Sequence, residues 1–338
     1  MKRILIILII IPFVLLFSSC FHEEEFSNTK HGNFEALWKI MDERYCFFDY
    51  KGIDWDEVYQ RYSERIDEQM PNQAFFDVLG EMLAEVKDGH VNLIASHNVA
   101  RYWKWYEDYP DNFDEKIQRN YIETDYGIAS GLKYKILDDN IGYIYYGSFS
   151  SGIGEGNLDQ VLSQMSICNG IIIDVRNNGG GTLTNVDKFA SRFFNQKTLV
   201  GYIMHKKGKG HSDFSRPYKR HIEPSDRIRY QKDVVVITNR RCYSATNDFV
   251  NAMRYAPNVT IIGDKTGGGS GLPFSSELPN GWSVRFSASP MLDADQEHIE
   301  FGIEPDKNVQ MSTSDMMKGK DSIIEYARAF LNDKYINK

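Results

Sequence analysis

The sequence has few cysteines, no surplus of positive charge and no apolar run long enough to span a membrane comfortably. Only four of its 338 residues are cysteine, and no two of them form a Cys-x-x-Cys pair. The sequence therefore indicates neither a disulfide framework nor a zinc site, and we expect neither a metal nor a cofactor. A formal net charge of −8 argues against nucleic acid as the main partner.

The longest apolar run, Ile4–Phe17, stands at the N-terminus after the basic Met1-Lys-Arg3. It is short for a transmembrane helix and ends in Leu16-Phe-Ser-Ser-Cys20. This pattern resembles a bacterial lipoprotein signal, in which small residues precede a cysteine that becomes lipidated. We expect residues 1–20 to be that signal and Cys20 to carry a lipid anchor to a membrane, with an uncleaved anchor as the alternative.

A polar tether is expected over residues 21–32. It begins with the acidic Glu23-Glu-Glu25, which resembles the export tag of surface lipoproteins in some Gram-negative bacteria. The expected location is therefore the outer membrane of a Gram-negative bacterium, on its periplasmic or outer face. A short acidic run is also what a solvated tether carries.

Residues 33–97 are expected to form an N-terminal domain of three amphipathic helices. Each expected helix has apolar residues at three- and four-residue spacing. The first is capped by Asn33, the second begins at a capping box of Asp54 and Glu57, and the third follows Pro71. Residues 98–131 are aromatic and charged without a clear period, and are expected to be an irregular connection.

From residue 132 to residue 338, strand and helix patterns alternate, which predicts an α/β core domain. The runs Gly170–Val175 and Val234–Ile237 are apolar and largely β-branched, as in strands buried on both faces. Further strands are expected at 132–137 and 141–146. The basic loop His205–His211 is expected to be solvated and mobile.

Ser244 lies where the strand pattern of Val234–Ile237 gives way to a helix pattern. A hydroxyl at such a corner can project over the carboxyl end of a sheet, and the backbone amide of Ala245 in the first helical turn is free to stabilise an oxyanion. The glycine-rich turn containing Gly179 and Gly180 offers further amides for the same purpose. The alternative for Ser244 is an ordinary N-cap serine.

His90 is the histidine best placed to act as a base. Of the eight histidines, only His90 and His97 lie in the folded N-terminal part, and His90 stands on a corner between an expected helix and the expected strand Val91–Ile94. A structural or exposed histidine remains the alternative. Cys242 lies two residues before Ser244, but a small buried residue in the turn is the better interpretation.

Five short blocks occur in order between residues 88 and 306. They are Asp88-Gly-His90, Asp174-x-Arg-x-Asn-Gly-Gly180, Ser244-Ala-x-x-Asp248, Gly263-Asp-x-Thr-Gly-Gly268 and Gly302-Ile-Glu-Pro-Asp306. Together they resemble the signature blocks of the tail-specific, or C-terminal-processing, serine peptidase family. The resemblance implies a ClpP/crotonase-like β-α-β core after the helical domain, and a peptide or unfolded protein as substrate.

The family has two catalytic styles. In one, a lysine activates the serine and a PDZ domain presents the substrate; here Gly269 stands where that lysine is expected, and the segment between His97 and Leu132 is too short for a PDZ domain. In the other, tricorn-like style, the serine acts with a histidine from the N-terminal block and a glutamate near the C-terminal block, and Ser244 is the matching serine here. The resemblance then implies His90 as base and Glu300 as its partner, with Glu304 as the fallback.

The sequence therefore predicts a lipid-anchored serine peptidase of the cell envelope. Two alternatives remain open. One is a catalytically silent protein of the same fold that binds peptides or hydrophobic ligands, because tricorn has a serine where this chain has Gly89. The other is a processing peptidase that pairs Ser244 with Lys265.

Overall fold

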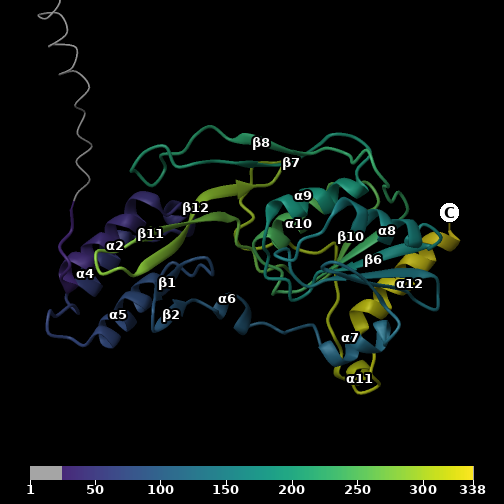
Figure 1. Cartoon of the computed structure of the whole chain (residues 1–338), viewed down its shortest axis with the longest axis horizontal. Coiled ribbons are helices and arrows are strands. Elements are labelled where there is room, and N and C mark those ends of the chain that lie inside the picture. The colour runs from purple at the N-terminus through teal and green to yellow at the C-terminus, as the bar shows by residue number, and fades with distance from the viewer. Residues whose placement is uncertain (1–24, 338) are drawn as a thin grey trace, which may run out of the picture.

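A computed structural model of the chain describes residues 25–337. The expected signal peptide, Cys20 and the first four residues of the expected tether, 21–24, lie outside these residues. No helix within residues 25–337 is both long enough and apolar enough to cross a membrane. Figure 1 shows two lobes, with helices α2, α4 and α5 in one and the yellow C-terminal helix α12 in the other.

The larger sheet forms the core of the C-terminal lobe. Its order is β13 (Lys307–Asn308), β10 (Val259–Gly263), β9 (Val234–Thr238), β6 (Gly170–Asp174), β5 (Ile141–Tyr146), β4 (Leu132–Ile136) and β3 (Gly127–Ala129). Neighbours from β13 to β5 are parallel, and β5, β4 and β3 pair antiparallel. Around it lie α7 (Glu115–Ile122), α8 (Glu155–Met165), α9 (Leu183–Ala190) with the 3-10 turn Ser191–Phe193, α10 (Ala245–Met253), α11 (Thr313–Met316) and α12 (Ser322–Ile336).

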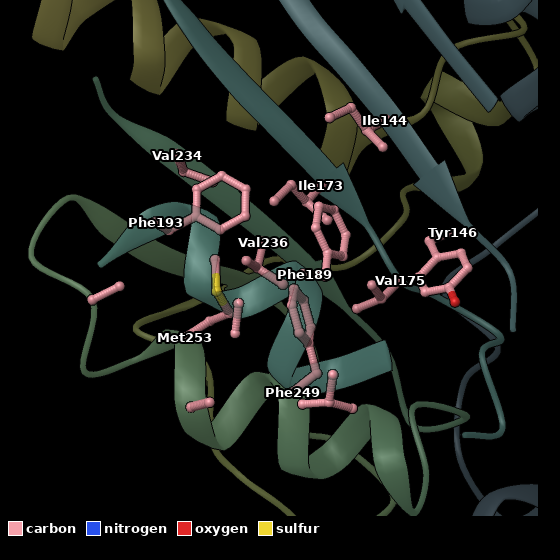
Figure 2. Close-up of a cluster of buried hydrophobic side chains, with 14 of the residues drawn as sticks. Ile144, Tyr146, Ile173, Val175, Phe189, Phe193, Val234, Val236, Phe249 and Met253 are labelled. Atoms are coloured by element: carbon pink, nitrogen blue, oxygen red, sulfur yellow. The ribbon is translucent and has the colours of Figure 1, made fainter. Parts of the chain in front are cut away.

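Both faces of this sheet are covered, which explains the unbroken apolar runs. Ile173 lies in one buried cluster with Phe189 of α9 and Phe249 of α10 (Figure 2). Its neighbour Ile172 points to the other face and lies in a second cluster with Ile324 of α12. Alternate side chains of a strand are therefore buried on opposite sides. The predicted α/β fold class is confirmed.

The N-terminal lobe combines helices with the smaller sheet. Its helices are α2 (Lys30–Arg44), α3 (Phe48–Lys51), α4 (Trp55–Ser63) and α5 (Asn72–Ala84). The smaller sheet has the order β2 (Asn98–Arg101), β1 (Asn92–Ala95), β12 (Ser283–Leu292), β7 (Thr198–Ile203) and β8 (Tyr218–Ile222), with β11 (Gly271–Glu277) also paired to β12. Strands β7 and β8 extend from this lobe over the other (Figure 1).

Helix α2 begins earlier than the sequence predicts. Thr29 is its N-cap, and the Thr29 side chain accepts a hydrogen bond from the Gly32 amide. Asn33, the expected cap, is instead buried and accepts a hydrogen bond from the amide of Asn280. The predicted cap of α4 is confirmed, because Asp54 accepts from the amide of Glu57.

The predicted core domain over residues 132–338 does not pack as one unit. Strand β12 pairs with β1 and with β11, and Val284 and Phe286 of β12 lie in one buried cluster with Phe34 of α2. This return of the chain ties the two lobes together. A register between strands nearly 200 residues apart has no local sequence signal.

The expectation that residues 98–131 are irregular is wrong. The segment contains β2, the short helix α6 (Lys104–Glu107), α7 and β3. Asp114 caps α7 by accepting from the amides of Lys116 and Ile117, and Ile122 is buried in the core of the C-terminal lobe. Two helical turns are too few for a convincing period in the sequence.

The basic loop 205–211 makes specific contacts with the N-terminal lobe. His211 Nε2 lies 2.7 Å from Asp42 Oδ1, and Lys209 Nζ lies 2.8 Å from Glu43 Oε1. Both acidic partners belong to α2. The loop therefore helps to fasten the hairpin of β7 and β8 to that helix.

Candidate active site

The Ser244 corner has a strained backbone. Ser244 follows β9, immediately precedes α10, and has φ 57° and ψ −121°. A non-glycine residue rarely adopts a positive φ, and such strain is typical of a nucleophile held on a sharp strand-to-helix turn. The Ser244 amide is held by the carbonyl of Gly268 at 2.9 Å.

The Ser244 side chain does not cap the helix that it precedes. It makes no hydrogen bond to the first turn of α10. Its Oγ lies 2.9 Å from Nε2 of His90 instead. The ordinary N-cap alternative is therefore wrong, and the structure brings together the two residues that the sequence places 154 positions apart.

His90 lies on the turn between α5 and β1, and its backbone amide donates to Asp88 Oδ1 at 2.8 Å. Burial lowers the pKa of the imidazole to about 4, an effect opposed by Asp88 and assisted by Arg285 and Lys51. His90 is therefore neutral near pH 7. With its proton on Nδ1, Nε2 is free to accept the hydroxyl proton of Ser244.

The predicted hydrogen bond between Glu300 and His90 is absent from the structure. Glu300 Oε1 lies 2.9 Å from Lys51 Nζ, and Oε2 accepts from the Ser270 amide at 2.7 Å. Among residues 25–337, His90 Nδ1 is buried with no hydrogen-bond partner. Glu300 binds the ammonium of Lys51 and not the imidazole of His90, because a buried carboxylate is stabilised more by a cation than by a neutral ring.

The fallback carboxylate, Glu304, does not support His90 either. Its side chain is exposed and lies 2.8 Å from Lys265 Nζ. Lys265 is thereby drawn to the surface, and no contact between Lys265 and Ser244 occurs among the described residues.

Sequence reasoning missed a buried polar cluster behind His90. Asp88 Oδ2 accepts from Tyr45 Oη at 3.1 Å and from Ser287 Oγ at 2.8 Å, and Oδ1 accepts from Tyr243 Oη at 3.3 Å. Lys51 Nζ lies 3.8 Å from Asp88 Oδ2. Asp88 could have been found, because it belongs to the block Asp88-Gly-His90. No pattern in the sequence indicates that Lys51 belongs to the site.

The predicted oxyanion hole is reduced to two of its three amides. The Gly180 amide donates to Asn178 Oδ1 at 3.0 Å, so it is not free for an oxyanion. The amides of Gly179 and Ala245 have no hydrogen-bond partner within residues 25–337. A Cβ on Gly180 would lie 2.8 Å from Ser244 Cβ, so the glycine turn packs directly against the corner.

A pocket of about 80 Å³ opens beside Ser244. Its wall is largely apolar, with Arg285 and Asp248 as the charged exceptions. Asp248 is buried and paired with Arg220, whose Nη2 lies 2.9 Å from Asp248 Oδ2. The larger apolar lining residues are Leu183, Leu272, Pro273, Met291 and Ile299.

The site as a whole can perform nucleophilic chemistry. A strained serine contacts a neutral imidazole, one free amide lies at the start of α10 and another in the glycine turn, and a pocket adjoins the serine. Within the described part of the chain, no three side chains of His, Cys, Asp or Glu gather in a way that could hold a metal ion.

Two family models match the chain. The model described as peptidase family S41 matches residues 140–309, half of the chain, and the model described as the tricorn protease C1 domain matches residues 26–84. Among curated proteins, the carboxy-terminal processing protease CtpA of Bacillus subtilis (strain 168) is 26% identical over 202 residues. That match covers 59% of this chain and 40% of the Bacillus protein, less than half of its length.

Solved structures with this fold are also similar. The crystal structure of a candidate peptidase from Parabacteroides merdae ATCC 43184 is 58% identical, covers 90% of this chain and 97% of its own, and has a TM-score of 0.87. Mature CPAF complexed with lactacystin covers 92% of this chain and 99% of its own at a TM-score of 0.70. Its identity is 11%, so it shows a likeness of fold alone.

Proposed function

Because the chain belongs to peptidase family S41, we propose that it is a serine peptidase with Ser244 as nucleophile and His90 as general base. The observation that carries this proposal is the 2.9 Å contact between Ser244 Oγ and His90 Nε2 at the strained corner. The expected substrate is a peptide or an unfolded protein. Processing at a carboxyl terminus belongs to the same proposal, on the strength of the similarity to CtpA.

The geometry supports an acyl-transfer mechanism. The Ser244 proton passes to His90 Nε2 as Oγ attacks the peptide carbonyl, and the amides of Gly179 and Ala245 stabilise the oxyanion. His90 then gives that proton to the leaving amine, which departs and leaves an acyl ester on Ser244. A water molecule, deprotonated by His90, hydrolyses the ester and restores the free enzyme.

A silent binding protein is the second candidate, and the unpaired His90 Nδ1 favours it. A serine-reactive fluorophosphonate probe and casein hydrolysis separate the two functions. We expect the chain beginning after Cys20 to be labelled at Ser244 and to cleave casein. Absence of both would favour the binding protein.

The Lys265→Ala variant belongs in the same experiment. Because Lys265 is paired with Glu304 at the surface, we expect this variant to keep both labelling and cleavage. Loss of activity in Lys265→Ala, with His90→Ala still active, would establish the serine–lysine mechanism instead.

The location of the protein is a separate part of the proposal. We propose that Cys20 is lipidated and anchors the peptidase to the outer membrane, because small residues precede this cysteine after an apolar run. The full chain expressed in a Gram-negative host should incorporate labelled palmitate, and Cys20→Ala should not. Equal palmitate labelling of the wild type and of Cys20→Ala would contradict a lipid anchor at Cys20.

A further inference from the structure

Lys51 is a buried lysine that the N-terminal lobe contributes to the active-site region. It is the last residue of the short helix α3, and its side chain is 4% exposed. Its Nζ lies 2.9 Å from Glu300 Oε1, 3.8 Å from Asp88 Oδ2 and 3.2 Å from the carbonyl of Val86. A lysine is almost never buried in this way unless it is paired.

The surroundings of Lys51 keep its ammonium charged and in place. Burial alone would lower the pKa of Lys51, but Glu300 and Asp88 raise it above its usual value. Its Nζ also lies 5.4 Å from the ring centre of Phe47 and 5.8 Å from that of Phe301. Aromatic faces attract a cation at such distances.

Without this ammonium, two buried carboxylates would remain. Burial raises the pKa of Glu300 to about 7, and Asp88 adds to this, whereas Lys51 opposes both, so Glu300 is protonated in acidic solution. Burial would likewise raise the pKa of Asp88, but Lys51 and His90 hold it below its usual value. The two acids therefore depend on a single cation, because a buried charge without a partner is expensive.

The charged groups that face His90 come from several elements. Asp88 lies on its own turn, Arg285 on β12 and Lys51 on α3. Tyr243, before α10, has its ring 5.0 Å from the imidazole. Arg285 and Lys51 both disfavour protonation of His90, and Asp88 favours it.

We propose that Lys51 is a positioning residue of the active site. Its ammonium holds the Asp88 carboxylate and the Glu300 carboxyl group in place behind His90 and disfavours a second cation there, so that the imidazole stays neutral and directed at Ser244. The N-terminal lobe therefore supplies a charge that the active site requires, in addition to packing against it. This inference rests on the proposed function of Ser244 and His90.

The test is the pH dependence of kcat/KM for a fluorogenic peptide, compared between the wild type and Lys51→Met. For the wild type we expect the acidic limb near pH 4, where His90 becomes protonated. Removing the cation takes away a charge that disfavours the imidazolium and leaves the Asp88 carboxylate to stabilise it, so the limb should move up by about one pH unit. The value of KM should change little, because Lys51 is not among the described residues that line the pocket beside Ser244.

Two further variants isolate the charge from the packing. Lys51→Arg retains the cation and should keep the limb near the wild-type position. The double variant Lys51→Met with Asp88→Asn removes one charge of each sign and should move the limb back toward the wild-type position. A purely structural role would lower the melting temperature and kcat in Lys51→Met without moving the limb, and that result would overturn the inference.

The outcome can be told apart from a failure of the proposed function. An inactive wild type would refute the peptidase itself. An active wild type, with a Lys51→Met limb at the same pH, would refute only the role of Lys51. The rate of fluorophosphonate labelling, followed over the same pH range, gives a second readout that does not depend on peptide binding.

Discussion

Replacing Ser244 with alanine is expected to reduce kcat/KM on casein-derived peptides by about 10⁴- to 10⁶-fold. The hydroxyl is the group that forms the acyl bond, and the nearby thiol of Cys242 cannot replace it, because Cys242 is fully buried and burial raises the pKa of its thiol to about 12. Progress curves at micromolar enzyme concentration would measure the effect. The melting temperature should stay the same or rise slightly, because alanine removes no hydrogen bond from α10.

His90→Ala should lose activity to a similar degree. The serine and its base act as one unit, so the double variant should be no worse than either single variant. His97→Ala is the matched control, since this exposed histidine lies in the same lobe and contacts only Phe76 and Trp282 among the described aromatic rings. An active His90→Ala variant with normal melting would remove the general base from the mechanism.

The two principal residues of the site could be predicted from sequence because each lies in a local pattern. Ser244 follows an unbroken β-branched run and opens a helix, and His90 follows the last turn of an amphipathic helix. Neither pattern gives the distance between them. The resemblance of five blocks supplied that link, and the 2.9 Å contact now provides the geometry.

The partner of Glu300 could not be predicted, because it depends on a lysine in a four-residue helix. Helix α3 is too short for a period, and Lys51 in the sequence resembles a surface residue. Only the folded chain shows that Asp88 and Glu300 meet at this ammonium. Charge pairing across long separations carries no local signal, so the sequence could not show that Glu300 binds Lys51. The family resemblance assigned Glu300 to His90 instead.

The division into domains failed for a similar reason. Strand β12 begins with the alternation of a half-exposed strand, and the sequence does not say which sheet it joins. The structure pairs β12 with β1 and β7, so the hydrophobic core of the N-terminal lobe closes over residues from both ends of the chain. Long-range pairing of this kind is set by the whole fold.

Arg176 forms a fully buried ionic junction between three distant parts of the chain. Its guanidinium contacts Asp174 at 2.6 Å at the end of β6 and Asp321 at 2.9 Å at the N-cap of α12. It also donates to the carbonyl of Asn112 at 3.1 Å. The turn that follows carries Gly180 against the Ser244 corner, so the junction supports both the stability of the lobe and the site.

Arg176→Met is therefore expected to lower the free energy of unfolding by about 3–5 kcal/mol, because it leaves Asp174 and Asp321 buried without their cation. Urea unfolding followed by circular dichroism would measure the loss. Arg119→Met is the matched control, since its exposed pair with Glu115 on α7 should leave the unfolding midpoint unchanged.

Neutralising the two acids separates the unpaired charge from the lost packing. Arg176→Met combined with Asp174→Asn and Asp321→Asn leaves no buried charge behind, and an asparagine at position 321 can still cap α12. We expect this triple variant to recover much of the stability that Arg176→Met loses. If Arg176→Met unfolded at the same urea concentration as Arg119→Met, the Arg176 junction would make no net contribution to stability. Apolar packing around β6 would then have to hold the glycine turn against Ser244.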